Sequence, residues 1–423
     1  MYNPPQGYPL IRAHFLARLC QCDEFSPPKH HQGYVNLTVK EKYVYLTLAL
    51  LGDPLNIVYF LGCKIFHPNP AKIVLKTILS FYMAFSAVQT FYMISAPQEV
   101  DMVNYGALFL QMLWAMLGIL VLLSKSDLIE DVMSSIDLWA IDSADEETET
   151  KILKESKFIN MYVFLNTVVG LVWAITMTFP NHREVEHFFP VFLFQKWLPQ
   201  HNHFLGYVFK ITSFVTSFTM VAHGYQVIYA TQHLKFQIYI FNKFVENICY
   251  GFIENEEKVV HDRTYQSEIE YRLKVLIKRH QDFFKWRNHT LSIMKHLIVP
   301  FSFGGCLIGM SVGFGFLQIT KNSPLILFFR AAFFTILATS TFCSLIAAGQ
   351  TLETESDNIY NRLMSTNWYQ WKGNNRKILA VILCNSINPI NLKFTDSFAI
   401  NFRLGMAICK TVYTAVSVFY NVK

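Results

Sequence analysis

The sequence predicts an all-α protein that crosses a membrane about seven times, with its amino terminus in the cytosol and its carboxyl terminus outside. Of the 423 residues, 52% are hydrophobic and 16% aromatic, and only 16% are charged, which is typical of a chain embedded in lipid. Mean hydropathy is a modest +0.26, so a sizeable polar region should also lie outside the bilayer. Two further observations support this fold class: uncharged runs long enough to span a membrane, and an uneven distribution of Lys and Arg between the two sides.

Six runs are long enough for a helix to cross the hydrocarbon core, which takes about 20 residues. They are Thr77 to Gln98, Met102 to Ser124, Phe158 to His182, Ile211 to Leu234, His296 to Thr320 and Ala331 to Leu352. A seventh run, near Asn401 to Val422, is interrupted by Arg403 and Lys410 but is included.

An eighth apolar stretch, Tyr43 to Cys63, contains Asp53 followed by Pro54, and also Gly62. Proline in a helix removes a hydrogen bond and clashes with the preceding turn. This stretch is therefore interpreted as broken interfacial or re-entrant helices. Counting it as a span would invert the topology.

The positive charges set the expected orientation. With seven spans, roughly three quarters of the 36 Lys and Arg residues fall on the amino-terminal side of the membrane. Loops rich in Lys and Arg stay in the cytosol, so the amino terminus is expected there. A G-protein-coupled receptor would have the opposite orientation. The same charges are spread among membrane-flanking loops, which favours contact with lipid and gives no reason to expect a nucleic-acid partner.

The long loop between the fourth and fifth spans has helical periodicity in its second half. Apolar or half-polar residues recur every three or four positions at Ile269, Leu273, Leu276, His280, Phe283, Arg287, Leu291 and Met294, and the opposite face carries Lys274, Lys278, Arg279 and Lys285. This pattern predicts an amphipathic helix that runs into the fifth span and joins a cytosolic bundle. The bundle either packs within one chain or also contacts neighbouring subunits.

The sixth span should continue inward, and Arg376 to Asn385 should form a short helix that stops before Pro389. The predicted regions are 1–76, the cytosolic amino terminus; 77–234, the first four spans, with the ligand-binding part; 235–295, the anchor loop; 296–352, spans five and six; 353–395, the inner anchor and short helix; and 396–423, the last helix.

Polar residues form a stripe along the last helix. Arg403, Lys410, Thr414, Ser417 and Asn421 are separated by seven, four, three and four positions, which places them on one face. Unpaired polar groups are costly in lipid, so this face should meet water or protein. The stripe either lines a pore or makes hydrogen bonds between helices.

At this point the sequence resembles an insect odorant receptor, most closely in its C-terminal third. The resemblance is carried by Leu273, Ile277, His280 and Phe283, then by Gly349, Leu352, Glu355, Ser356, Ile359, Tyr360, Trp368, Trp371, Arg376, Lys377, Ile387, Pro389, Phe402, Lys410 and Tyr413. Two departures are mild: Phe394 stands where a small residue is common, and Thr414 replaces the usual serine. The chain length, with no long insertion between spans four and five, resembles that of an odour-tuned subunit rather than the coreceptor.

The resemblance implies a tetrameric, odorant-gated, nonselective cation channel in the plasma membrane of a sensory-neuron dendrite. Its partners would be a small volatile odorant, coreceptor subunits and membrane lipid. It implies that the last helix lines the pore, with Lys410, Thr414 and Ser417 along it and a gate at Val418, Asn421 and Val422. The main alternatives are a gustatory-type channel of the same superfamily and a secondary transporter. No enzyme motif is present, and no cofactor or metal site is expected.

The resemblance also places a ligand pocket in the outer half of spans two to six. With the predicted orientation, the candidate contacts are Tyr105, Phe109, Met112, Trp173, Thr176, Met177, Tyr207, Ile211, Phe214, Phe316, Phe329 and Phe333. Ligand pockets are mostly apolar with few polar groups, and these residues fit that composition. The histidine-containing loop from Asn181 to His203 could form a lid, and ordinary helix packing is the competing role for each aromatic residue.

Overall fold

The computed structural model describes residues 53–124, 128–134, 136, 138–180, 184–251, 260–317, 319, 324–395 and 398–422. The first part of the predicted interfacial stretch Tyr43 to Cys63, residues 43–52, lies outside these ranges. Its described end is the short helix α3 (Asn56–Gly62), followed by a 3-10 turn at Lys64–Phe66.

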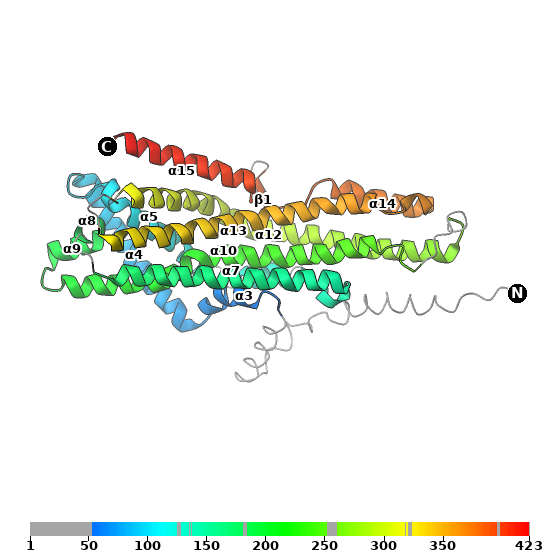
Figure 1. The fold of residues 1–423 in the computed structure, drawn as a ribbon, viewed down its shortest axis with the longest axis horizontal. Coiled ribbons are helices and arrows are strands. Elements are labelled where there is room, and N and C mark those ends of the chain that lie inside the picture. The colour runs from blue at the N-terminus through cyan, green and yellow to red at the C-terminus, as the bar shows by residue number, and fades with distance from the viewer. Residues whose placement is uncertain are drawn as a thin grey trace.

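Long helices run side by side along one axis and form an elongated bundle (Figure 1). In chain order they are α4 (Asn69–Ser95), α5 (Met102–Ser124), α6 (Leu128–Ser134), α7 (Glu146–Thr178), α8 (Glu184–His187), α9 (Phe189–Trp197), α10 (Asn202–Glu246), α12 (Arg263–Leu317), α13 (Leu325–Met364), α14 (Gly373–Ser386) and α15 (Phe402–Val422). Short 3-10 turns lie at Ile141–Ser143 and Trp368–Gln370, and a two-strand ladder pairs β1 (Lys393–Thr395) with β2 (Phe398–Ala399) just before α15. Helices α8 and α9 lie at one end, the α9 end, and α14 lies at the other, the α14 end.

Each predicted span overlaps one long helix, although α4 ends at Ser95, α7 at Thr178 and α12 at Leu317, before the predicted ends Gln98, His182 and Thr320. Helix α5 has the predicted bounds, and the final helix begins one residue after the predicted start. Among the described residues, five helices are long and apolar enough to cross a membrane: α4, α5 from Asn104, α7, α10 and α13. These five confirm the class of helical membrane protein, while the count of seven spans and the orientation of the termini stay predictions.

Several helices are longer than the hydropathy predicted, because each continues past the apolar run into polar sequence. Helix α12 has 55 residues and joins the periodic loop to the fifth span without a break, which confirms the predicted continuous helix. At 1.5 Å per residue it is about 80 Å long, against a hydrocarbon core of about 30 Å. More than half of α12 therefore lies outside any membrane that the chain crosses.

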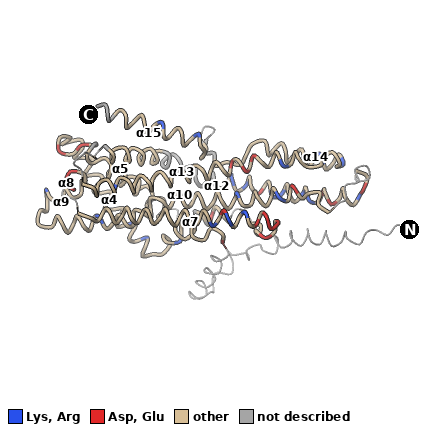
Figure 2. Tube along the Cα trace, in the orientation of Figure 1, with Lys and Arg blue, Asp and Glu red and all other residues tan. Residues whose placement is uncertain are grey.

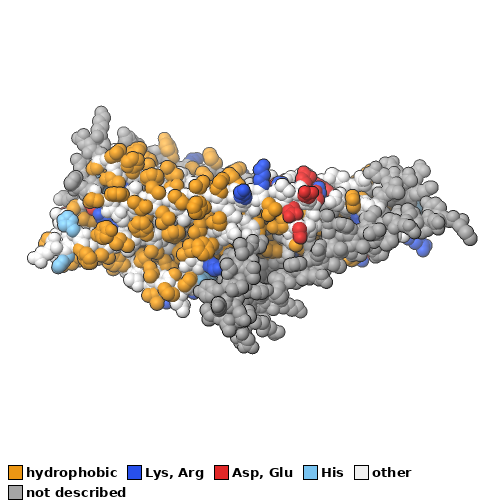
Figure 3. All heavy atoms as spheres, turned by 60° about the horizontal axis from the view of Figure 1, so that its bottom comes forward, with side chains coloured by type: hydrophobic (Ala, Val, Ile, Leu, Met, Phe, Trp, Pro, Cys, Tyr) orange, Lys and Arg blue, Asp and Glu red, His pale blue; other side chains and the backbone are white. Residues whose placement is uncertain are grey.

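Charged and hydrophobic side chains are concentrated in different halves of the bundle along the same axis. Lys, Arg, Asp and Glu concentrate toward the α14 end of the trace and are sparse along the other half (Figure 2). Hydrophobic side chains cover the half nearer the α9 end on the face drawn in Figure 3. Phe91, Phe158 and Phe164 are among the exposed large hydrophobic residues of the chain. An apolar belt beside a charged extension is the pattern expected of a spanning bundle with a domain beyond the bilayer.

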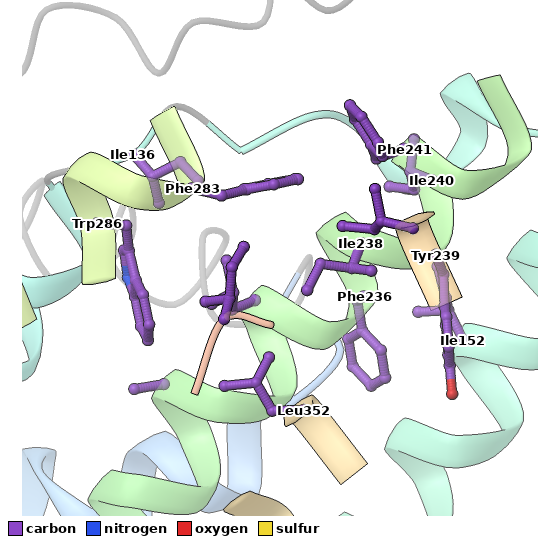
Figure 4. Packing of buried hydrophobic residues seen from close by; sticks show 14 of the residues in the cluster. Ile136, Ile152, Phe236, Ile238, Tyr239, Ile240, Phe241, Phe283, Trp286 and Leu352 are labelled. Atoms are coloured by element: carbon purple, nitrogen blue, oxygen red, sulfur yellow. The ribbon is translucent and has the colours of Figure 1, made fainter. Parts of the chain in front are cut away.

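A hydrophobic core holds the α14 end together. Figure 4 shows Phe236 and Phe241 of α10 with Phe283 and Trp286 of α12 and Leu352 of α13 in one cluster. Phe241, Phe283 and Leu352 have no exposed surface. At the α14 end, three long helices thus bury one another's side chains, as the amphipathic pattern predicted.

Polar contacts attach α14 to this core. The Gln266 side chain accepts from the Lys372 backbone N–H at 2.8 Å and donates to the Gln370 carbonyl at 3.0 Å, and Asn375 donates to the Gln266 carbonyl at 2.9 Å. Helix α14 ends at Ser386, before Pro389, as predicted. One residue differs from the predicted polar face: Arg279 is 3% exposed and donates to Gln237, so it belongs to the core.

His280 gives the stability of the core at the α14 end a pH dependence. It lies against the Phe241 ring, with Nε2 3.2 Å from the Ser386 hydroxyl, and burial lowers its pKa to about 4 from 6.5. A lowered folded-state pKa means that protonation favours unfolding, so stability is full above pH 6.5 and falls as the pH drops toward 4. The loss should reach about 2 kcal/mol by pH 5.

Thermal unfolding of the purified protein in detergent between pH 7.5 and 5 measures this effect. The variant His280→Gln should show a shallower decline than the wild type. His289 is exposed on the same helix, so His289→Gln serves as the control and should keep the wild-type slope. Equal slopes for all three proteins would contradict a buried neutral His280.

Candidate ligand site and the last helix

Two small adjoining cavities lie among the helices toward the α9 end. The first, the α10 cavity, has a volume of about 20 Å³ and is bounded by α4, α5, α7 and α10. The second, the α13 cavity, has about 60 Å³ and is bounded by α5, α7, α12 and α13. Leu108, Gln111, Trp173, Met177 and Phe188 line both and form the partition between them.

The walls are largely apolar. In the α13 cavity the Trp173 and Phe334 rings lie 5.6 Å apart between centroids, and Phe188 closes the side toward α9. Such a surface suits a small apolar molecule. Both volumes are below the roughly 150 Å³ of a cavity that holds benzene, so a ring-sized ligand requires side chains to move. Met112, Met177 and Met220 line the α10 cavity, and methionine adapts readily to such changes.

A buried ionic cluster forms one edge of the site. The Lys210 ammonium of α10 lies 2.7 Å and 2.9 Å from the two oxygens of Glu184, the first residue of α8, and the Arg330 Nη2 of α13 lies 3.2 Å from Oε1. Side-chain exposure is 7% for Lys210, 11% for Glu184 and 4% for Arg330. Charges so deeply buried are retained only when they are paired.

Arg330 also closes the end of α7. Its Nε donates to the Thr176 carbonyl at 3.0 Å, and Nη2 donates to the carbonyls of Met177 at 3.3 Å and Phe179 at 2.5 Å. The last carbonyls of a helix lack partners within the helix and carry the negative end of its dipole. One guanidinium thus joins α7, α8 and α13 at the edge of the α13 cavity.

The twelve predicted ligand residues are distributed unevenly around these cavities. Met112, Trp173 and Met177 line them. Tyr105 and Thr176 are buried beside them, with Tyr105 donating to the Val185 carbonyl, and Phe109, Phe214 and Phe333 are half-buried in the surrounding packing. The other four are exposed by 42% to 52% in the single chain: Tyr207, Ile211, Phe316 and Phe329.

The predicted ligand residues do not include the polar residues of the cavity walls, notably Gln111, Lys210, Ser311 and Arg330. The positions of these residues in the sequence could have indicated three of them. Lys210 and Arg330 immediately precede two apolar runs, and Gln111 lies in the middle of a third. Polar residues at such positions usually face the interior of a bundle and mark functional sites.

Helix α15 lies at the periphery of the bundle and packs on one side only (Figure 1). Its apolar face fits a groove of glycines on α12, where an added Cβ would meet Ile408 at Gly305, Val412 at Gly309 and Val416 at Gly313. Glycines spaced by four let membrane helices approach closely. Lys410, Thr414 and Val418 are exposed on α15, Ser417 is half-buried, and the side chains of Asn421 and Val422 lie outside the described residues.

The connection to α15 is tied to α13. Ser356 accepts from the Ile390 backbone N–H at 2.6 Å, and Glu353 accepts from the side chains of Asn391 and Asn401, both at 3.3 Å. Gln350 accepts from the backbone N–H of Phe402 at 3.3 Å, the first residue of α15. Helix α13 therefore lines the α13 cavity near one end and holds the start of α15 farther along.

Comparison with known proteins supports this architecture. A family model described as 7tm Odorant receptor matches residues 100–413. The structure of the insect olfactory receptor OR5 from Machilis hrabei is similar with a TM-score of 0.59 at 10% identity, and that of the same receptor in complex with eugenol with 0.56 at 10%. Each match covers 90% of this chain and 100% of the other. No functionally curated protein matches the sequence significantly.

At 10% identity, the solved structures bear on the fold alone, whereas the family model matches well over half of the chain. The protein therefore belongs to the 7tm Odorant receptor family, and it is a multi-pass membrane receptor rather than an enzyme.

Proposed function

We propose that this chain is an odour-tuned subunit of a ligand-gated, nonselective cation channel. A small volatile molecule binds in the two cavities, and binding opens a central pore lined by α15. The subunit assembles with coreceptor subunits as a tetramer in the plasma membrane of a sensory-neuron dendrite, surrounded by lipid. In this arrangement the α9 end faces outward and the α14 end lies in the cytosol, which tags on the two termini of intact cells would test.

The ligand part of the proposal rests on the cavities and on family membership. The related receptor OR5 was solved with eugenol, a small organic molecule. Met112, Trp173 and Met177 are the first contacts that we propose, because they were candidates from the sequence and line the cavities. Tyr105, Phe109, Thr176, Phe214 and Phe333 remain candidates if the site expands.

The pore part rests on one observation, the polar face that α15 turns away from its own bundle. Lys410, Thr411 and Thr414 are exposed there, while Ile408 and Val412 pack on α12. Polar side chains at membrane depth require water or protein against them. In a tetramer with the α15 helices at the centre, that face would meet water in a shared pore, with Val418, Asn421 and Val422 near its outer end.

Electrical recording tests the proposal. Co-expression with an insect coreceptor in oocytes should give cation current when a volatile from a broad panel is applied. Surface expression with no current to any volatile, accompanied by saturable uptake of a solute, would identify a transporter instead. Responses confined to nonvolatile tastants would favour the gustatory-type channel.

A charge at the proposed gate should change the current. Val418 is 56% exposed on α15, and a carboxylate in its place alters the electrostatics of a narrow pore. Val418→Glu should shift single-channel conductance or ion selectivity. Val381 is 55% exposed on α14, so Val381→Glu introduces the same charge at the same exposure and should leave both properties unchanged. Identical conductance and selectivity in both variants would count against the pore assignment.

A further inference from the structure

The α13 cavity has two polar side chains on its wall with buried atoms that lack a hydrogen-bond partner among the described residues. These atoms are Nη1 of Arg330, a donor, and Oε1 of Gln111, an acceptor. A buried polar group left without a partner costs roughly 1–3 kcal/mol. Two such atoms at one cavity indicate a polar group on the molecule that fills it.

The free donor is fixed by the rest of its guanidinium. Nε and Nη2 of Arg330 are occupied by three carbonyls and by Glu184, which leaves Nη1. The guanidinium carbon lies 5.1 Å from the centroid of the Phe188 ring, another cavity residue, which further restrains its plane. None of these contacts uses Nη1, so an acceptor on the ligand would not compete with them once the cavity expands to hold it.

The identity of the free acceptor follows from a short hydrogen-bond chain. The Ser311 hydroxyl donates its single hydrogen to the Ala107 carbonyl at 2.8 Å, so it must accept from Gln111. Gln111 therefore presents its NH₂ group to Ser311, at 3.0 Å, and its amide cannot be flipped without losing that bond. This leaves Oε1 as an acceptor that requires a donor.

The charge around Arg330 does not call for an anion. Glu184 is shared by Arg330 and Lys210, and the carbonyls at the end of α7 supply further negative potential next to the guanidinium. A carboxylate on the ligand would accept from Arg330 but would face Gln111 Oε1 with a second acceptor. A carbonyl on the ligand would likewise leave Gln111 Oε1 without a donor. A hydrocarbon would leave both Gln111 Oε1 and Arg330 Nη1 without a hydrogen-bond partner.

We infer that the odorant carries a hydroxyl group, as an alcohol or phenol, which accepts from Arg330 and donates to Gln111. The inference rests on the proposed function and specifies the chemical class of its ligand. A hydroxyl both donates and accepts, so one ligand oxygen can satisfy the two wall residues. The apolar remainder of the ligand packs against Trp173, Phe188 and Phe334.

Two matched series of volatiles test the inference in the co-expressed receptor. The first series is benzyl alcohol, benzaldehyde, benzoic acid and toluene. The second series is hexanol, hexanal, hexanoic acid and hexane. Both series are tested within a broader panel of alcohols, phenols, esters and hydrocarbons. The strongest agonist should carry a hydroxyl. Within a series, the alcohol should act at a concentration about tenfold or more below that of the hydrocarbon. Hydrocarbons, esters or acids as the strongest agonists would overturn the inference.

A variant of Gln111 isolates the acceptor. Gln111→Met keeps the length of the side chain without the amide, and should reduce the alcohol preference about tenfold, toward equal potency. Gln89 is buried on α4, donates to the Tyr105 carbonyl and does not line either cavity, so Gln89→Met should keep the preference. A preference unchanged in Gln111→Met overturns the role of this residue, because a structural defect alone lowers potency for all ligands.

A measurement of ligand binding to the wild-type protein tests the same inference without any substitution. Purified wild-type protein should gain more thermal stability from benzyl alcohol or hexanol than from toluene or hexane at equal concentration. Failure of the proposed function has a different signature, which is neither current nor stabilisation from any volatile in the panel. Stabilisation by hydrocarbons equal to that by alcohols would leave the receptor function in place and refute the hydroxyl preference.

Discussion

Glu184→Gln should cost the folded receptor about 3–5 kcal/mol, because it leaves two buried cations without their carboxylate. Lys210 is 7% exposed, and both hydrogen bonds that its ammonium makes to described residues go to the oxygens of Glu184. Arg330 keeps its three carbonyl partners, so most of the loss falls on Lys210. The melting temperature in detergent and the amount of receptor at the cell surface should both fall.

A second substitution should reverse the defect. In Glu184→Gln combined with Lys210→Met, the unpaired cation is gone, and much of the lost stability should return. The exposed pair Lys196 and Glu99 has the same 2.7 Å separation with 42% and 52% exposure, so Glu99→Gln is the matched control and should leave the melting temperature nearly unchanged. Equal losses from Glu184→Gln and Glu99→Gln would show that burial of the cluster has no energetic consequence.

The fold was largely predictable because hydropathy and periodicity are local. Met102 to Ser124 is one uncharged run and forms α5 with those bounds. The period of Ile269, Leu273 and Leu276 continues into the fifth span, and α12 is accordingly continuous. Helix ends were less predictable. Helix α7 begins twelve residues before the predicted start at Phe158, because Asp145 caps it by accepting from the Thr148 N–H and three glutamates occupy its first turn.

The site was less predictable, because its contacts join distant parts of the chain. Glu184 and Arg330 are separated by 146 positions, and Gln111 and Ser311 by 200. Aromatic residues dominate the predicted set because the sequence contains 38 Phe, but composition does not show which of them turn toward a cavity. Trp173 lines both cavities, whereas Phe316 and Phe329 are largely exposed, and only the packing of α7, α12 and α13 distinguishes them.

The contact between α13 and the connection to α15 has so little space that Gly349→Ala should disrupt it. A Cβ at Gly349 would lie 2.1 Å from the Ile400 carbonyl oxygen, and backbone cannot rotate aside as a side chain can. Helix propensity favours alanine by about 1 kcal/mol. The clash should outweigh this gain, with a net loss at or above the upper end of the roughly 1–3 kcal/mol typical of overpacking.

The position of Ile400 makes this loss specific to α15. Ile400 lies between β2 and Phe402, where α15 begins, so a shift of its backbone moves the proposed pore helix. Gly349→Ala should therefore lower the melting temperature and reduce odorant-evoked current per receptor at the surface. At Gly373, the first residue of α14, an added Cβ meets nothing within 4 Å, and Gly373→Ala should preserve stability and current. If Gly349→Ala matched Gly373→Ala in both measurements, the connection would have room to move, and α13 would not be the element that positions α15.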